Sequence, residues 1–226
     1  MKTCTAIILS AGSGKRFGSE MPKQYNLLDG KEVIIHTIEK IAQAMLISNI
    51  VMVVGDDDIN FIINLLRKYK ISEVSYIVRG GKRRVDSVKN GIMATGSDYV
   101  AIHDGARPFV SPDKVDLAVE RAFETGAAIL AAPANETIKI AHQRIIEDTP
   151  ERKNLWFAKT PQVFERKLFT ELISKIPDDF TPTDDAQIFE YFGYDVEIVP
   201  DYPTNIKITY PHDIEIGKIL LKKQDK

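Results

Sequence analysis

The residues with the clearest capacity for chemistry lie in one loop near the N-terminus. An apolar segment ends there and is followed by small residues and cations: Ser10, Ala11, Gly12, Gly14, Lys15, Arg16 and Lys23. Glycines let backbone N–H groups approach an anion without an intervening Cβ, and the nearby ammonium and guanidinium groups neutralise its charge. This loop is therefore a candidate phosphate cradle.

The spacing excludes two familiar glycine-loop motifs. A dinucleotide-binding fingerprint that begins at Gly12 requires a third glycine at position 17, where the chain has Phe17. A P-loop requires Ser or Thr after its Gly-Lys pair, but Gly14 and Lys15 are followed by Arg16. What remains is either a phosphate site of another kind or a strand-to-helix turn with solvated charges.

Two further clusters follow predicted strands. Residues 79–87 (RGGKRRVDS) form a second glycine turn with four cations, which is either an anion site or a solvated basic turn. Residues 103–108 (HDGARP) hold a carboxylate and a guanidinium. Asp104 is a candidate ligand of Mg²⁺, which takes one or two carboxylates and completes its shell with water and substrate phosphates. The alternative is an ion pair with Arg107 that only fixes the turn.

Two more segments are weaker candidates for site residues. Residues 205–209 (NIKIT) alternate in polarity, which predicts a short strand with Lys207 on the same face as Asn205 and Thr209. Residues 183–185 (TDD) fit a helix N-cap, although they are the acidic segment most open to a functional role.

The chemistry that these residues suit is phosphoryl or nucleotidyl transfer. No nucleophile-elbow Gly-x-Ser-x-Gly occurs, and the four histidines have no evident common partner. Several cations and one metal site are enough for such a transfer without a general base. The reason is that an attacking phosphate monoester, with a second pKa of about 6, is largely dianionic at neutral pH.

The elements that must position these residues alternate along the chain. Strands are predicted at 5–9, 50–54, 74–78 and 98–102, and helices at 32–46, 57–70 and 84–95. This alternation indicates an α/β fold with a mostly parallel sheet and helices on both faces, which binds ligands at the carboxyl ends of its strands. The remaining predicted elements are a helix after Ser111-Pro112, helices at 165–176 and 183–192, a strand at 195–199 and a helix from Pro211.

The regular alternation of predicted strands and helices stops after residue 133. Residues 137–140 and 145–149 alternate as a hairpin, and an isolated two-stranded ribbon is marginally stable in water. We therefore expect residues 134–158 to form a β-arm that packs on a second copy of the chain. The whole chain, 1–226, is predicted to be one domain.

Composition narrows the range of partners and cellular locations expected for the protein. The formal net charge of −2 provides no overall positive field for nucleic acid or an anionic membrane. The single cysteine cannot form an internal disulfide, and no apolar run is long enough to span a membrane. A cytoplasmic protein without nucleic-acid or membrane partners is expected.

Seven motifs in this order resemble those of the 2-C-methyl-D-erythritol 4-phosphate cytidylyltransferase family. They are residues 10–18 with 22–24 (SAGSGKRFG, PKQ), 80–88 (GGKRRVDSV), 103–108 (HDGARP), 136–139 (ETIK), 160–162 (TPQ), 183–185 (TDD) and 205–209 (NIKIT). The resemblance implies a nucleotide-binding α/β sheet, CTP as co-substrate, Mg²⁺, release of pyrophosphate and a homodimer with exchanged β-arms.

The resemblance also implies roles for individual residues. The loop Ser10, Ala11, Gly12, Gly14 and Lys15 would cradle phosphates, and Arg16 and Lys23 would stabilise charge on the triphosphate. Gly81, Arg84 and Ser87 would meet the cytidine, and Asp104 the metal. The sugar phosphate would be bound by Thr160 and Lys207 and, from the partner's arm, by Thr137 and Arg152. Arg107 would support that end of the site. Arg16, Lys23, Arg152 and Lys207 would be the catalytic residues.

Two alternatives remain open from the sequence. A ribitol-5-phosphate cytidylyltransferase has the same chemistry, although Gly105-Ala106 and residues 156–159 (WFAK) favour the methylerythritol phosphate enzyme. A nucleotide-binding regulatory module without turnover would need the loops but neither Lys207 nor Arg152.

Overall fold

A seven-stranded mixed sheet organises the structure, a computed structural model that describes residues 1–12, 17 and 21–224. Its strands, in the order β11-β7-β10-β6-β1-β4-β5, are β1 (Cys4–Ser10), β4 (Ile47–Val54), β5 (Val74–Arg79), β6 (Tyr99–Asp104), β7 (Ala127–Pro133), β10 (Trp156–Glu165) and β11 (Glu197–Pro200). Neighbours are parallel except at β10, which is antiparallel to both β6 and β7. The predicted α/β class, with a mostly parallel sheet, is confirmed.

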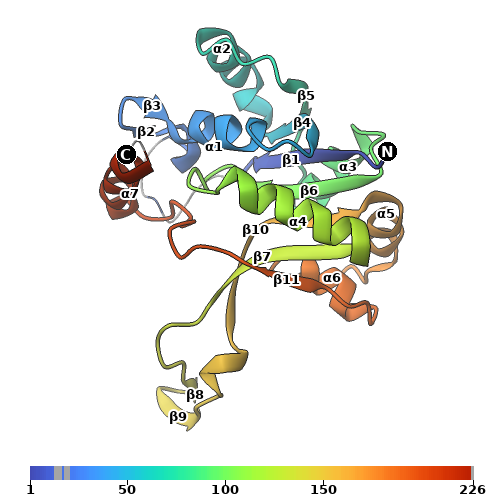
Figure 1. Cartoon of the computed structure of the whole chain (residues 1–226), viewed down its shortest axis with the longest axis vertical. Helices are drawn as coiled ribbons and strands as arrows, with labels where there is room; N and C mark the ends of the chain where they lie inside the picture. Colours follow the sequence, from blue (N-terminus) through green and yellow to red (C-terminus); the bar gives the residue numbers. More distant parts are fainter. Residues whose placement is uncertain (13–16, 18–20, 225–226) are drawn as a thin grey trace.

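Helices cover both faces of the sheet (Figure 1). One face carries α1 (Val33–Ala42), α2 (Ile59–Lys68) and α4 (Pro112–Thr125), and the other carries α3 (Arg84–Met93), α5 (Arg166–Lys175) and α6 (Ala186–Tyr191). Because successive strand residues point to opposite faces, Ile7 of β1 joins the core under α3, and Ile8 joins the core under α1. Burial on both faces explains why β1 is an almost continuous apolar run.

The C-terminal helix α7 (His212–Gln224) lies beside a small ribbon of β2 (Leu27–Leu28) and β3 (Lys31–Glu32). A third apolar cluster joins these elements to the turn after β6 through Leu28, Ala106, Phe109 and Ile208. Short 3-10 helices lie at Lys23–Tyr25, Asp56–Asp58 and Arg152–Asn154. Among residues 1–12, 17 and 21–224, no helix has the length and apolar character needed to cross a bilayer.

The structure differs from the sequence expectations in three respects. The strand predicted at 205–209 is wrong: the segment joins no sheet and makes one backbone bond to the turn after β6, from Ile208 N–H to Ala106 O at 2.8 Å. Strand β10 was not predicted, and its first residues overlap the expected arm. The predicted helices at 32–46 and 183–192 form, but they are shorter than expected, ending at Ala42 and beginning at Ala186.

A β-arm projects from the body where β7 and β10 continue past the other strands (Figure 1). Its tip is the antiparallel pair β8 (Ile140–His142) and β9 (Ile145–Asp148), so the first strand begins later than predicted. Every residue of β8 and β9 is exposed, and Ile145 and Ile146 expose 70% and 60% of their surface. The arm therefore has an apolar surface that its own chain does not cover.

Candidate active site

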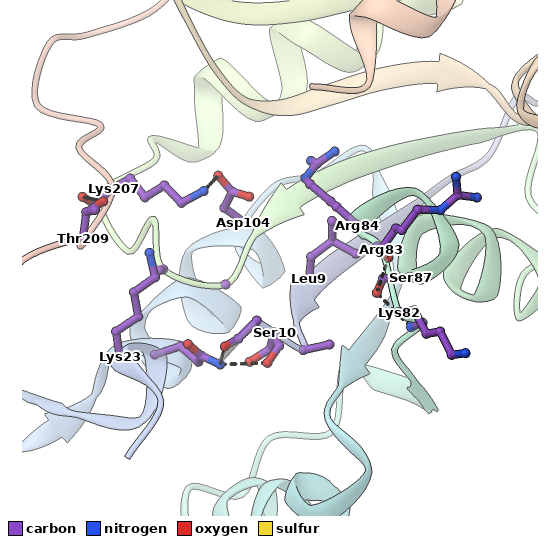
Figure 2. A pocket seen from close by; sticks show the side chains of 16 residues that line it. Leu9, Ser10, Lys23, Lys82, Arg83, Arg84, Ser87, Asp104, Lys207 and Thr209 are labelled. Atoms are coloured by element: carbon purple, nitrogen blue, oxygen red, sulfur yellow. Dashed lines mark hydrogen bonds and ion pairs between the residues drawn. The ribbon is translucent and has the colours of Figure 1, made fainter. Parts of the chain in front are cut away.

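A cleft of about 430 Å³ opens at the carboxyl ends of β1, β5 and β6 (Figure 2). Its walls come from the loop after β1, the turn after β5, the end of β6 and the segment before α7: Leu9, Ser10, Ala11, Gly12, Lys23, Gln24, Gly81, Lys82, Arg83, Arg84, Ser87, Asp104, Gly105, Ala106, Lys207 and Thr209. This is the edge at which open α/β sheets bind ligands.

Cations from distant parts of the chain meet in this cleft. Lys23 and Lys207 lie on one side of it, and Lys82, Arg83 and Arg84 lie on the other (Figure 2). Such a concentration of positive charge in a concave site attracts polyanions. The predicted residues Gly14, Lys15 and Arg16 lie outside the residues that the structure describes.

The end of β1 and the residues directly after it are held by the side chain of Gln24, which the sequence marks only as the last residue of the PKQ motif. Gln24 is buried, and its Nε2 donates hydrogen bonds to the carbonyls of Ser10 at 2.7 Å and Gly12 at 3.2 Å. The next residue, Tyr25, donates from its hydroxyl to Asp58 at 3.1 Å. These contacts fix the backbone next to Lys23, which lines the cleft, and residue type and spacing in the PKQ motif do not show which groups Gln24 binds.

The turn after β5 packs tightly against the loop after β1. Gly80 N–H donates to Val54 O at 2.8 Å, and a Cβ at Gly80 would collide with the side chain of Ala11. Gly81 N–H donates to Ser87 Oγ at 3.0 Å, and a Cβ there would collide with Asp86. Both glycines are thus required by close approach, and Ser87 shapes the turn from within.

Asp104 is the acidic centre of the cleft. Its Oδ2 accepts from Lys207 Nζ at 2.8 Å and from Arg107 Nε at 3.2 Å. Burial opposes ionisation of this carboxyl, but the charges of Lys207, Arg107 and Arg84 outweigh it and hold the pKa of Asp104 well below its usual range. The ion pair with Arg107 considered from the sequence is therefore formed, on a carboxylate that also lines the cleft.

Behind Asp104, a buried network joins three chain segments. Arg107 Nη1 donates to Asn205 O at 3.1 Å, and Asn205 Nδ2 donates to Thr160 O at 3.2 Å. Thr160 Oγ1 accepts from the backbone N–H of Asp104 at 3.1 Å. Arg107 and Thr160 therefore lie behind the lining of the cleft and support Asp104 and the segment that carries Lys207.

His103 completes this network and has a defined tautomer. Its Nε2 lies 3.2 Å from Arg107 O, which can only accept, so Nε2 carries the proton. Its Nδ1 then accepts from the Thr160 hydroxyl at 3.0 Å. The ring is fully buried, and burial lowers the pKa of His103 to about 4. His103 is therefore a neutral structural residue at physiological pH.

This burial predicts a pH-dependent stability. Unfolded histidine titrates near about 6.5, so between that pH and about 4 the unfolded chain binds a proton that the folded chain excludes. The free energy of unfolding should fall by roughly 1.4 kcal/mol per pH unit as the pH decreases through this window, and this contribution is constant above it. Urea unfolding with EDTA, compared between wild type and His103→Asn, should show the smaller slope in the variant. Equal slopes would exclude a buried neutral His103.

Two predicted site residues lie far from the cleft within one chain. Thr137 and Arg152 are exposed residues of the β-arm, and Arg152 Nη1 donates to Asn135 O of the same arm at 3.1 Å. The arm extends away from the sheet edge that forms the cleft (Figure 1). Within one chain, these two side chains therefore do not join the cleft.

Comparison with known proteins agrees with this geometry. The family model described as 2-C-methyl-D-erythritol 4-phosphate cytidylyltransferase matches residues 4–223. The protein of that name from Syntrophus aciditrophicus is 41% identical over 225 residues, which cover 97% of this chain and 96% of the relative. The one from Clostridium botulinum strain Eklund 17B is 40% identical over 222 residues, which cover 97% and 99%.

Solved structures give the same result. The 4-diphosphocytidyl-2C-methyl-D-erythritol synthase of Anaerococcus prevotii superposes with a TM-score of 0.87 at 31% identity, covering 98% of this chain and 96% of that one. The 2-C-methyl-D-erythritol 4-phosphate cytidylyltransferase of Francisella tularensis superposes with a TM-score of 0.77 at 29% identity, covering 97% and 100%. The chain, with its cationic cleft at the carboxyl edge of the sheet, therefore belongs to the 2-C-methyl-D-erythritol 4-phosphate cytidylyltransferase family.

Proposed function

We propose that this chain transfers CMP from CTP to 2-C-methyl-D-erythritol 4-phosphate by holding two polyanions in line within the cleft described above. The products are 4-diphosphocytidyl-2-C-methyl-D-erythritol and pyrophosphate. The observation that carries the proposal is the meeting of Lys23, Arg84 and Lys207 around Asp104 at the carboxyl edge of the sheet. Family membership supplies the identity of the substrates.

Catalysis in this site is positional and electrostatic. An oxygen of the methylerythritol phosphate attacks the α-phosphorus of CTP, and the bond to pyrophosphate breaks on the opposite side. Lys207 lies where it can pair with the attacking phosphate, and Lys23 lies beside the loop proposed to cradle the triphosphate. Lys15 and Arg16, on the same loop, are proposed to act with Lys23 as pyrophosphate leaves. The attacking phosphate is already dianionic, so no side chain has to remove a proton.

The nucleotide side is proposed to lie along the turn after β5. Gly81 and Arg84 line the cleft there, and Ser87 supports the turn through its bond to Gly81 N–H. Arg84 would contact the cytidine with the guanidinium donors that face the cleft. The support network of Arg107 and Thr160 would keep Asp104 and Lys207 at the acceptor end.

The donor set at Asp104 fits Mg²⁺. Asp104 is a carboxylate at the lining of the cleft, and its Oδ2 is paired with Lys207 and Arg107. Within residues 1–12, 17 and 21–224, no three His, Cys, Asp or Glu side chains gather to hold a metal alone. A single carboxylate is sufficient for Mg²⁺ when substrate phosphates complete the shell, and the bound ion would neutralise phosphate charge.

Replacing the proposed ligand should change the metal requirement. For Asp104→Asn we expect the Mg²⁺ concentration at half-maximal activity to rise about tenfold or more, because the variant loses its anionic oxygen. Titration of pyrophosphate release against Mg²⁺ measures this. Asp116→Asn is the control, since Asp116 accepts backbone bonds from Met45 and Leu46 away from the cleft. An unchanged Mg²⁺ dependence in Asp104→Asn would remove Asp104 from the metal site.

The acceptor end of the site is proposed to be completed by a second copy of the chain. Thr137 and Arg152 cannot serve the cleft of their own chain, and the arm exposes Ile145 and Ile146. A homodimer with exchanged arms would cover these side chains and bring Arg152 to the partner's acceptor phosphate.

We place the enzyme in the cytoplasm, because CTP is an intracellular nucleotide and Cys4 is a buried free thiol.

The dimer is tested directly by mass. Light scattering at micromolar concentration should give about twice the 25.4 kDa of one chain, and Ile145→Ser combined with Ile146→Ser should shift the mass towards the monomer. Ile219→Ser is the matched control, since Ile219 on α7 is also 59% exposed but lies away from the arm. A wild-type monomer would contradict the exchanged arms.

The reaction is tested by pyrophosphate release with CTP and Mg²⁺, run side by side with methylerythritol 4-phosphate and ribitol 5-phosphate. We expect release with the methylerythritol substrate and little with ribitol phosphate. Preference for ribitol phosphate would reassign the acceptor. Binding of CTP without release from either acceptor would instead indicate a regulatory nucleotide-binding module.

A further inference from the structure

A buried carboxylate lies directly behind the nucleotide side of the cleft. Asp185, in the loop before α6, accepts from Arg84 Nη1 at 2.6 Å and from Arg84 Nη2 at 2.7 Å. Its side chain is 2% exposed and does not line the cleft, whereas the Arg84 side chain is 34% exposed and does. The pair therefore joins a residue of the binding surface to one in the interior.

Asp185 is itself held rigidly. The side-chain oxygen Oε1 of Gln162, on β10, accepts from the backbone N–H of Asp185 at 2.9 Å and from that of Ala186 at 3.1 Å. Gln162 Nε2 donates to Asp184 Oδ2 at 2.9 Å, and Asp184 Oδ1 accepts the Gln187 N–H at 3.1 Å. The Asp184 side chain thus binds a backbone N–H in the first turn of α6, and the side chain of Asp185, the N-cap residue, makes no capping bond and faces Arg84 instead.

The neighbouring arginine forms a second link to the same region. Arg83 Nη1 donates to Asp178 O at 3.1 Å, in the loop between α5 and α6. Successive arginines of the nucleotide turn are therefore both bound to residues 178–185. A guanidinium has five N–H donors, of which Asp185 uses two, so Arg84 retains donors for a ligand in the cleft.

We propose that Asp185 is a positioning residue for the nucleotide site, which acts by holding the Arg84 guanidinium in the orientation that meets CTP. The bidentate geometry sets both the position and the plane of the guanidinium, which a single contact would leave free to rotate. The inference rests on the proposed function in taking CTP as the ligand of Arg84. It assigns a role to the second aspartate of the Thr183-Asp-Asp segment, which the catalytic scheme does not use.

The test separates binding of CTP from binding of the acceptor. Asp185→Asn should raise the KM for CTP by about tenfold or more, the equivalent of losing one hydrogen bond to a charged group, and leave the KM for methylerythritol 4-phosphate within about twofold. Glu197→Gln is the matched control, because Glu197 forms a bidentate pair with Arg121 at 2.9 and 3.0 Å away from the cleft. Its KM for CTP should be unchanged.

A double-mutant cycle distinguishes positioning from a general structural role. If Asp185 acts through Arg84, adding Asp185→Asn to Arg84→Met should change the KM for CTP by less than about twofold. Additive effects, or a wild-type KM for CTP in Asp185→Asn, would overturn the proposal. If Asp185→Asn does not fold, Asp185→Glu keeps a buried charge beside Arg84 but moves the carboxylate, and a wild-type KM for CTP in that variant would overturn the proposal.

Failure of the proposed reaction is recognised separately. The affinity for CTP is also measured by calorimetry, which needs no turnover. Loss of CTP affinity in Asp185→Asn would support the positioning role even if wild type released no pyrophosphate with either acceptor. Unchanged CTP affinity in a variant of an active enzyme would overturn the positioning role alone.

Discussion

Lys207→Ala is expected to lower kcat by roughly a hundredfold or more, which corresponds to roughly 3 to 4 kcal/mol of transition-state stabilisation. Lys207 Nζ lies 2.8 Å from Asp104 and lines the cleft, so its charge is in place before the substrates bind. The variant should fold, because the segment that carries Lys207 is anchored by other groups: the Asn205 side chain and the Ile208 N–H. Steady-state kinetics together with thermal unfolding measure both expectations.

The control for this prediction is a lysine in a similar pair elsewhere. The Lys68 ammonium lies 3.1 Å from Glu32; the side chain of Lys68 is 56% exposed and that of Glu32 is 9% exposed. The Lys207–Asp104 pair is similar, with a 36% exposed lysine beside a nearly buried carboxylate. Lys68→Ala removes the same kind of contact away from the cleft and should leave kcat unchanged. A Lys207→Ala variant with kcat near that of wild type would exclude Lys207 from the mechanism.

Lys23→Ala should have an effect of similar size, again roughly a hundredfold in kcat. The proposed role of Lys23 is to stabilise charge on the triphosphate, where it increases as the bond to pyrophosphate breaks. The backbone around it has other anchors, because Gln24 donates to the carbonyls of Ser10 and Gly12 and Tyr25 donates to Asp58. Single-turnover measurement of pyrophosphate release reports the chemical step separately from product release.

Two further variants define what Lys23 contributes. Lys23→Arg keeps the charge and should retain more activity than Lys23→Ala, although a planar guanidinium does not reproduce the compact ammonium. Lys31→Ala, which removes an ion pair with Glu39 at 2.8 Å outside the cleft, should leave turnover unchanged. If Lys23→Ala kept the single-turnover rate of wild type, the charge of Lys23 would have no part in the transition state.

Lys207 has a charged partner before any substrate binds. Lys207 is paired with Asp104, which also pairs with Arg107. A phosphate that enters beside Lys207 therefore meets a cation whose orientation is already set by a carboxylate. Preorganisation of this kind avoids a cost of reorientation during the reaction, which is how fixed charges contribute most to catalysis.

Local sequence was sufficient for most of the fold. The strands at 5–9 and 98–102 are apolar runs because they are buried on both faces, and this pattern is visible without coordinates. The hairpin was predicted from alternation at 145–149. The strand predicted at 205–209 does not form, because alternating polarity also occurs in this irregular segment. Asn205 and Ile208 are buried there, while Lys207 and Thr209 line the cleft.

The supporting side chains were the least predictable part of the site. Gln24, Gln162 and Asp185 are buried polar residues whose partners are distant in the chain or are backbone carbonyls and amides. All three belong to motifs that carry the family resemblance, but residue type and spacing do not show which groups they bind. Their roles follow from which loops the sheet brings together.

The sequence by itself determined the class of fold and the family, because these depend on residue types at short spacing, and it predicts a phosphate cradle in the first loop on the same basis. Only the tertiary structure decided that Lys23, Arg84, Asp104 and Lys207 share one cleft, and that Asp185 holds Arg84 from behind. The physical reason is that parallel strands end at a common edge, so residues far apart in the chain become neighbours there. Charge at that edge depends on distances between loops, and a linear sequence does not contain those distances.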